Sequence, residues 1–159
     1  MTPSDPASIA DRLDIIELIS KLSINLDARD WGAVRTLFTD EVYSDRTSLF
    51  GGEPVTLSAD EFVEGWRQSL DNLDAVNHLV ANHVITLEGD KAQCAANMQG
   101  VHVFHNPSGD DMWNVGGRHD YQLQRTAGGW RISGLTFTIS WATGNMNIVN
   151  LAAAAGASA

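Results

Sequence analysis

The sequence predicts a single α+β domain in which helices pack on one face of a strongly bent, mostly antiparallel sheet. Three observations predict this fold class. The chain has 159 residues, a usual length for one domain. Apolar residues recur at helical spacing in the first half. Four strand-like runs separated by short turns fill the second half, and helices followed by a strand meander are typical of α+β domains.

The first predicted helix follows Pro6, with Asp5 or Ser8 as its N-cap. Its apolar stripe consists of Ile9, Leu13, Ile16, Ile19, Leu22 and Leu26. A second stripe on the same helix changes from apolar to small side chains and ends at the acidic Asp27. A stripe of this kind suits a helix whose far end lines a cavity.

Two more helices and a loop complete the first half. Asp30 is the expected N-cap of a short helix over residues 31–38. Residues 39–54 predict a short strand and a glycine-rich loop. Ser58 and Glu61 have the spacing of a capping box, at the start of a helix that reaches about residue 70. The apolar face of that helix consists of Phe62, Trp66 and Leu70.

The second half contains four predicted strands, over about residues 76–87, 92–105, 113–125 and 130–141. The links between them are short, which favours antiparallel hairpins over crossover connections. Runs of about 11 residues or more are long for strands, so we expect a strongly bent sheet.

The composition excludes several classes of partner. Acidic residues number 20 and basic residues 10, giving a net charge of −10. A nucleic-acid binder needs a basic face, which this chain lacks, and an anionic membrane surface is disfavoured for the same reason. The one cysteine, Cys94, excludes an intramolecular disulfide and a multi-cysteine metal site. With no leader-like N-terminus and no long apolar run, the expected location is the cytoplasm.

Alternation along the strands sorts their side chains into two faces. The less polar faces carry His78 and Asn82 on the first strand, Met98 and His102 on the second, and His119 and Tyr121 on the third. If those faces are concave, the three histidines point into one cavity, whereas His83 and His105 face away. A single β-bulge would reverse such an assignment.

A carboxylate on a helix opposite a histidine on a strand is a recognisable pairing for proton transfer. The carboxylate orients the imidazole and stabilises its charged form, and the imidazole accepts a proton from carbon or oxygen. No metal site or nucleophile is expected, so the chemistry that fits is elimination, isomerisation or aldol-type cyclisation. The adjacent Asp45 and Arg46 favour a salt bridge within the loop, and a place at the rim of the pocket is the alternative.

Several spaced motifs carry a family resemblance. They are Leu26-Asp27-Ala28-Arg29-Asp30-Trp31, Leu37-Phe38-Thr39-Asp40-Glu41-Val42, His78-Leu79-Val80-Ala81-Asn82, Gly116-Gly117-Arg118-His119, Gly128-Gly129-Trp130-Arg131-Ile132 and Trp141-Ala142-Thr143-Gly144-Asn145. On these residues the chain resembles the SnoaL-like branch of the nuclear transport factor 2-like superfamily. The resemblance implies one domain over residues 1–145, a cone-shaped barrel of three N-terminal helices packed on a strongly curved, mixed, mostly antiparallel sheet around an apolar pocket. Residues 146–159 are then an alanine-rich tail, either a frayed end or an arm docked on a neighbour.

The resemblance also implies a site. In the dehydratase and dehydrochlorinase branches, an aspartate near the end of the first helix pairs with a histidine on a central strand, and Asp27 and His78 stand at those positions. His102 matches a second pocket histidine of the scytalone dehydratase group, and His119 falls where that group has an asparagine. The sequence departs from the pattern at Leu26, where relatives carry a tyrosine. It departs again on the last strand, where the dehydrochlorinase arginine is missing, so neither scytalone dehydration nor chloride loss is predicted as such.

Two function classes follow. The first is a cofactor-independent lyase or isomerase acting on a small hydrophobic molecule, such as a cyclic or polyketide-derived one. Asp27 orients His78, the general base, and His102 or His119 donates to the leaving or enolate oxygen; direct base action by Asp27 is a variant. The expected substrate-binding side chains are those of Asn82, His119, Tyr121, Met98 and Trp66.

The second class is a non-catalytic binding or assembly module, like the β subunit of a ring-hydroxylating dioxygenase. The last strand favours assembly because apolar side chains alternate along one of its faces, at Leu135, Phe137, Ile139 and Trp141. Burial of this face against a second subunit predicts a homodimer or homotrimer. An open apolar cavity with a linked Asp–His pair favours the enzyme, and a closed cavity favours the module.

Overall fold

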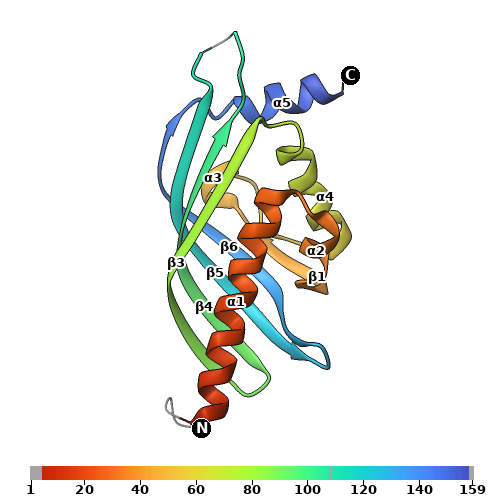
Figure 1. Cartoon of the computed structure of the whole chain (residues 1–159), viewed down its shortest axis with the longest axis vertical. Helices are drawn as coiled ribbons and strands as arrows, with labels where there is room; N and C mark the ends of the chain where they lie inside the picture. The colour runs from red at the N-terminus through yellow and green to blue at the C-terminus, as the bar shows by residue number, and fades with distance from the viewer. Residues whose placement is uncertain (1–4, 108, 158–159) are drawn as a thin grey trace.

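The computed structural model describes residues 5–107 and 109–157. A six-stranded sheet with the order β2-β1-β6-β5-β4-β3 curls around the helices without closing (Figure 1). Strands β1 and β6 pair in parallel and all the other neighbours pair antiparallel. The predicted α+β class with a mixed, mostly antiparallel sheet is therefore confirmed. The elements in chain order are α1 (Pro6–Ala28), α2 (Trp31–Arg35), β1 (Phe38–Asp45), α3 (Thr47–Phe50), β2 (Val55–Ser58), α4 (Ala59–Leu70), β3 (Ala75–Glu88), β4 (Lys91–Val103), β5 (Met112–Thr126), β6 (Gly129–Gly144) and α5 (Ile148–Gly156).

Capping residues define both ends of helix α1. The Asp5 carboxylate accepts a hydrogen bond from the Ala7 N–H, and Pro6 occupies the first turn, so Asp5 is the cap of the two predicted. The helix ends at Arg29, whose φ of 57° is left-handed. Its buried face packs on the inner face of the sheet and brings Asp27, in its last turn, to the side of β3.

The connection from α1 to α4 differs from its prediction in two places. Helix α2 ends at Arg35, because Phe38 already belongs to β1 and packs in the core with its ring centroid 5.2 Å from that of Phe62. Strand β2 lies between the expected loop, which ends at residue 54, and the helix that Ser58 caps, where no element was predicted, and it pairs with β1 at the edge of the sheet. The capping box that starts α4 is confirmed, with both reciprocal hydrogen bonds between Ser58 and Glu61.

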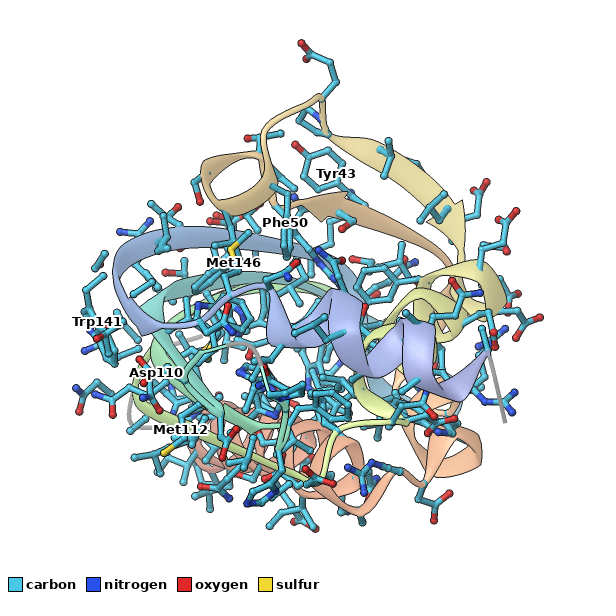
Figure 2. The ribbon with its side chains drawn as sticks, turned by 90° about the horizontal axis from the view of Figure 1, so that it is seen from above. Tyr43, Phe50, Asp110, Met112, Trp141 and Met146 are labelled. Carbon is cyan, nitrogen blue, oxygen red and sulfur yellow. The ribbon has the colours of Figure 1, made fainter. Side chains whose placement is uncertain are left out.

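The four long strands follow the predicted runs closely, and bulges bend them. Register shifts occur between Ala81 and Val84 on β3 and at Gly116 and Gly117 on β5. A Cβ on Gly117 would lie 2.2 Å from the backbone oxygen of Thr138, so only glycine allows that close approach. Seen from above, Met112 and Trp141 project outward from the curled sheet (Figure 2).

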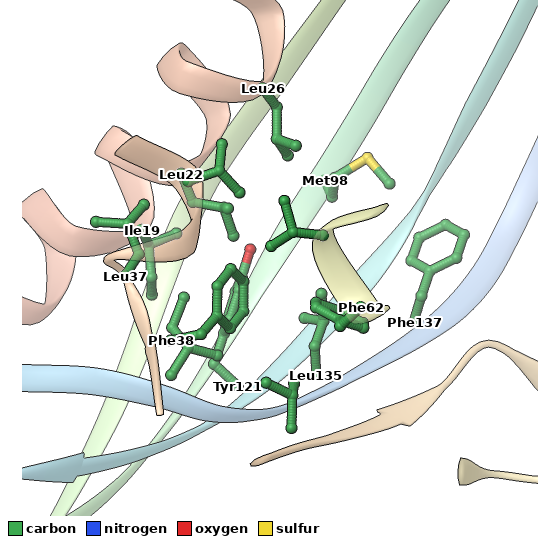
Figure 3. Packing of buried hydrophobic residues seen from close by; sticks show 14 of the residues in the cluster. Ile19, Leu22, Leu26, Leu37, Phe38, Phe62, Met98, Tyr121, Leu135 and Phe137 are labelled. Atoms are coloured by element: carbon green, nitrogen blue, oxygen red, sulfur yellow. The ribbon is translucent and has the colours of Figure 1, made fainter. Parts of the chain in front are cut away.

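The core fills the space between the helices and the concave face of the sheet. Figure 3 shows Leu22 and Leu26 of α1 facing Met98 and Tyr121 of the sheet. Helix α5, formed by the alanine-rich tail, packs against α4 and buries Ile148 and Ala152. Tail residues 158 and 159 lie outside the described residues. Within the described ranges, no helix combines the length and the apolar character needed to cross a bilayer.

Candidate functional site

A cavity of about 120 Å³ lies between the helices and the concave face of the sheet, close in size to the roughly 150 Å³ dry cavity known to bind benzene. The residues that line it are Leu22, Ser23, Leu26, Arg46, Leu49, Phe50, Trp66, Ser69, Leu70, His78, Val80, Met98, His102, Trp113, Val115, His119, Tyr121, Leu135, Phe137 and Val149. Phe50, which forms part of the wall, is 60% exposed. The lining is mostly apolar, and its main polar side chains are those of Arg46, the three histidines, Tyr121, Ser23 and Ser69.

Asp27 and His78 are linked by the shortest contact of the site. The Nδ1 atom of His78 lies 2.7 Å from Oδ1 of Asp27. The same carboxylate accepts the backbone N–H of His78, at 2.9 Å to Oδ2, and the Nδ2 amide of Asn77, at 3.0 Å. A carboxylate accepts only, so His78 donates through Nδ1, and its other ring nitrogen, Nε2, carries the free lone pair when the ring is neutral.

His102 also lines the cavity, and its Nδ1 atom faces a backbone carbonyl instead of a carboxylate. Its Nδ1 atom lies 3.3 Å from the carbonyl oxygen of Trp113, which can only accept a hydrogen bond. Burial, together with the nearby His78, lowers the pKa of His102 to about 4. His102 is therefore neutral at pH 7 and holds its proton on Nδ1. The sequence-based alternative in which His102 donates a proton to the substrate is not supported by this geometry.

His119 is the better donor. Its Nδ1 atom lies 2.8 Å from the Tyr121 hydroxyl, and this tyrosine is only 2% exposed. Among the described residues the tyrosine proton has no acceptor other than Nδ1, so Nδ1 accepts and the remaining proton of the neutral ring is on Nε2. Burial, with smaller contributions from His78 and Arg46, lowers the pKa of His119 to about 3 and keeps the ring neutral.

Gly100 on β4 provides the floor beneath two of these rings. A Cβ at this position would lie 3.0 Å from Cε1 of His102 and 3.3 Å from Cδ2 of His78. The two imidazole centroids are 5.5 Å apart and meet edge to face. The absence of a side chain at Gly100 thus lets both rings lie against the sheet.

The expected place of Asn82 in the cavity is wrong. The bulge in β3 follows Ala81, and Asn82 has a φ of +60° and is exposed. Beyond the bulge the two faces are exchanged, so Val84 is exposed and His83 turns inward instead of away. Burial lowers the pKa of His83, and its Nε2 atom is buried without a hydrogen-bond partner among the described residues. The other proposed substrate-binding residues, His119, Tyr121, Met98 and Trp66, do line the cavity.

Arg46 lines the cavity. The expected salt bridge between Arg46 and Asp45 within the loop is wrong. Asp45 instead accepts hydrogen bonds from the N–H and hydroxyl of Thr47, at 3.0 and 2.8 Å. The Arg46 guanidinium lies over the rings of Phe62 and Trp66, 5.2 and 4.9 Å from their centroids. The alternative, a place for Arg46 at the rim of the pocket, is correct. The sequence signal for it was the pair of aromatic residues Phe62 and Trp66, spaced four apart on α4.

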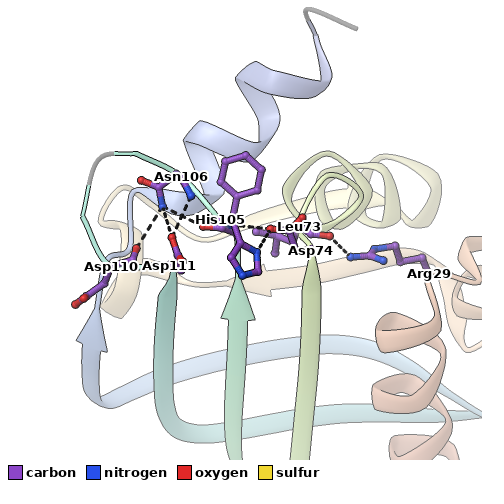
Figure 4. Close-up of polar contacts among 8 residues, drawn as sticks. Arg29, Leu73, Asp74, His105, Asn106, Asp110 and Asp111 are labelled. Carbon is purple, nitrogen blue, oxygen red and sulfur yellow. Dashed lines mark hydrogen bonds and ion pairs between the residues drawn. The ribbon is translucent and has the colours of Figure 1, made fainter.

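His105 was expected to face away from the cavity. His105 does face away, and it contacts Asp74 at 2.8 Å near the end of the molecule shown in Figure 4. Hydrogen bonding to that carboxylate raises the pKa of His105.

Leu135 and Phe137 were expected on an outer face of the sheet that packs on a second subunit, but they are buried and line the cavity. The expected homodimer or homotrimer therefore loses this argument and stays a prediction.

In the described part of the chain, no three His, Cys, Asp or Glu side chains converge in a group that could hold a metal ion. The arrangement consists of a carboxylate-bound histidine with a free lone pair, a neutral histidine donor and an arginine, gathered around an apolar space. Such a set can accept a proton from carbon and stabilise negative charge on oxygen.

Comparison with known proteins supports the fold and identifies the family. The uncharacterized protein Rv2910c of Mycobacterium tuberculosis is 27% identical over 126 residues, which are 79% of this chain and 83% of that protein. The solved structure of the Kfla4162 protein from Kribbella flavida has 29% sequence identity and a TM-score of 0.83, covering 91% of this chain and 98% of that one. The hexachlorocyclohexane dehydrochlorinase LinA-type3 from Novosphingobium barchaimii LL02 has 18% identity and a TM-score of 0.71, covering 91% and 97%, and shares the fold. The profile of the SnoaL-like domain matches residues 7–136, from α1 into β6, and the chain belongs to that family.

Proposed function

We propose that this protein is a cofactor-independent lyase or isomerase that removes a proton from carbon in a small, ring-sized hydrophobic substrate. The observation that carries the proposal is the 2.7 Å contact between Asp27 and His78 at the wall of an open apolar cavity. A catalytic imidazole needs a fixed orientation and a free nitrogen, and this contact supports both.

In the proposed reaction, Nε2 of His78 accepts a proton from the carbon next to a carbonyl group. Asp27 holds the ring and stabilises the imidazolium that forms. Negative charge moves to the carbonyl oxygen, where Nε2–H of His119 donates a hydrogen bond to the enolate. In an elimination, the bond from carbon to a β-hydroxyl breaks, and the leaving hydroxide takes the proton from His78 and departs as water. In an isomerisation the same proton returns to another carbon.

A simple probe tests the elimination. 3-Hydroxycyclohexanone loses water to give 2-cyclohexenone, whose conjugated carbonyl absorbs ultraviolet light. We expect the wild-type protein to accelerate this reaction, and His78→Gln to lower the rate by about 10²–10⁴-fold, the usual contribution of a general base. Asp27→Asn should also lower it strongly, because an amide offers one acceptor oxygen to the three donors that converge on Asp27.

A second probe covers isomerisation without elimination. Cyclohexanone in D₂O exchanges its protons next to the carbonyl, and one-dimensional proton NMR follows the loss of their signal. The matched control is His105→Gln, since His105 also contacts a carboxylate but lies outside the cavity. If the wild-type protein and the His78 variant exchange and dehydrate at the same rate, the cavity serves binding or assembly and the proposal is wrong.

A further inference from the structure

We infer that Arg46 forms, with His119, a subsite for an anionic oxygen, so that the substrate carries a carboxylate or an oxygen that bears charge as an enolate. This inference deepens the proposed function, because it assigns the charged group that the same cavity binds. It starts from an arginine that the fold leaves without a polar partner.

The guanidinium of Arg46 forms no hydrogen bond and no ion pair in the described part of the chain, whereas the side chain of every other arginine forms at least one. Burial lowers its pKa to about 10, which still leaves it charged at neutral pH. A desolvated cation without a counter-charge is costly. A ligand with an anionic oxygen would offset that cost.

No acidic side chain near Arg46 forms an ion pair with its guanidinium in the described part of the chain. No aspartate or glutamate lines the cavity, and the neighbouring Asp45 is occupied by Thr47. Arg46 also lines a second pocket together with Glu53 and Glu61, but neither glutamate forms an ion pair with it. The Glu61 carboxylate is bound to Ser58 in the capping box of α4.

The backbone on either side of Arg46 is fixed. Asp45 binds Thr47 across it, and the Ser48 hydroxyl donates to the carbonyl of Phe137 at 2.6 Å and accepts the Ile139 N–H at 3.0 Å. These contacts hold α3 on β6, beside the part of the cavity that His119 and Phe137 line. The guanidinium rests on aromatic rings rather than on acceptors, so its N–H groups are available to a ligand.

The base lines the same small cavity as Arg46. Arg46, His119 and His78 all line one cavity of about 120 Å³, so all three groups act on the same space. A ring that places an oxygen between Arg46 and His119 would therefore present a neighbouring carbon toward His78. The subsite would bind the charged form most tightly, because hydrogen bonds between ionic partners are the stronger ones.

Benzoate and benzamide test the inference, since they have the same shape and differ in charge. We expect titrations by calorimetry to give benzoate an affinity at least about tenfold higher than benzamide. Arg46→Met should remove this preference while leaving benzamide binding, which also reports that the variant folds. The matched control Arg118→Met, at an exposed arginine paired with Asp120, should keep the preference.

A measurement on the wild-type protein avoids dependence on the variant. Added benzoate should shift the side-chain Nε resonance of Arg46 in nitrogen-15 NMR and leave that of Arg118 unchanged. 4-Nitrophenol separates the two sources of charge: Arg46-dependent binding of its anion without binding of benzoate would assign the subsite to a ring oxyanion. Equal affinity for benzoate and benzamide together with no Arg46-dependent binding of nitrophenolate would overturn the inference.

Asp27→Asn separates this result from the proposed function. The substitution should abolish dehydration of 3-hydroxycyclohexanone and leave the preference for benzoate intact, because Asp27 contacts His78 and does not line the cavity. An anion preference without any proton transfer would support the subsite and contradict the enzyme. Proton transfer without an anion preference would support the enzyme and contradict the subsite.

Discussion

Three imidazoles line one cavity, and each has a different partner at Nδ1: a carboxylate for His78, a carbonyl for His102 and a hydroxyl for His119. The partner decides where the proton of the neutral ring resides. His78 and His102 keep it on Nδ1, whereas His119 keeps it on Nε2 because the tyrosine proton needs an acceptor. The same side chain thus serves as an acceptor and as a donor within one site.

The buried histidines should stay neutral far below pH 7. We expect proton NMR titration to place the pKa of His102 at about 4 and that of His119 at about 3, since burial disfavours their charged forms. His105 should titrate above the ordinary histidine value because of its contact with Asp74. A value near 6.5 for His119 would mean that the cavity is wetter than the structure implies, and would weaken its role as a neutral donor.

Gly100→Ala tests how closely the rings depend on the floor of the site. The added methyl group would press on His102 and His78, so we expect a loss of about 1–3 kcal/mol in the free energy of unfolding and a clear fall in dehydration rate. The control is Gly65→Ala on α4, where a Cβ meets nothing within 4 Å. It should stabilise the helix by about 0.5–1 kcal/mol, as urea unfolding would show. Full activity in Gly100→Ala would contradict the described placement of the rings.

At the scale of elements, α1 is held to the β5–β6 hairpin by Asp11. Its carboxylate accepts hydrogen bonds from Arg125 at 2.6 Å and from the indole N–H of Trp130 at 3.1 Å. Asp11→Ala leaves the buried indole N–H without an acceptor, so we expect a loss of about 1–3 kcal/mol in the free energy of unfolding. Asp14→Ala, at an exposed position on the same helix, should change it little.

The contribution of Asp11 should depend on pH. The hydrogen bond from Arg125 lowers the pKa of Asp11 below 3.8, so the stabilisation is fully present above that value and is lost as the pH falls through the lower folded-state pKa. Urea unfolding of the wild-type protein and of Asp11→Ala should therefore differ at pH 7 and converge in strong acid. A difference that persists unchanged at low pH would assign the effect to packing.

The sequence predicted the long elements because their signals are local. The helical stripe of α1, the capping box of α4 and the four long strands each depend on spacing within one segment. Strand β2 was missed because four residues at a sheet edge carry little pattern and need β1 as a partner. The position of Asn82 was wrong because a bulge shifts register without a clear mark in the residues before it.

The site was predictable to the same extent. Asp27 and His78 could be paired from the family resemblance, and the two side chains are in contact in the structure, while their catalytic role stays a prediction. The proton position on His102 could not be predicted, because Trp113 lies opposite His102 only once β4 and β5 are in register. The proton position on His119 could not, because it depends on the burial of the Tyr121 hydroxyl. The position of Arg46 in the cavity was not predicted because its aromatic neighbours lie on α4, far along the chain, whereas Asp45 is adjacent in the sequence and offered a simpler partner.

At the scale of the whole molecule, the tail forms part of the cavity wall. Ile148 is fully buried, and Val149 lines the cavity. We expect Ile148→Ala to cost about 2–5 kcal/mol in the free energy of unfolding, because it leaves a void between α5 and the body of the fold. Met146→Ala, at a side chain that is 47% exposed, is the control and should change stability little. Equal unfolding midpoints for the two variants would indicate a tail that frays in solution.

The central claim is that the fold prepares His78 as a base by binding its Nδ1 proton to Asp27. Long-range proton–nitrogen NMR of the imidazole rings at pH 7 reads this directly. We expect a His78 ring with a protonated Nδ1 and a bare Nε2, and a changed pattern in Asp27→Asn. A His78 proton on Nε2, or a spectrum that the Asp27 substitution leaves unaltered, would contradict it.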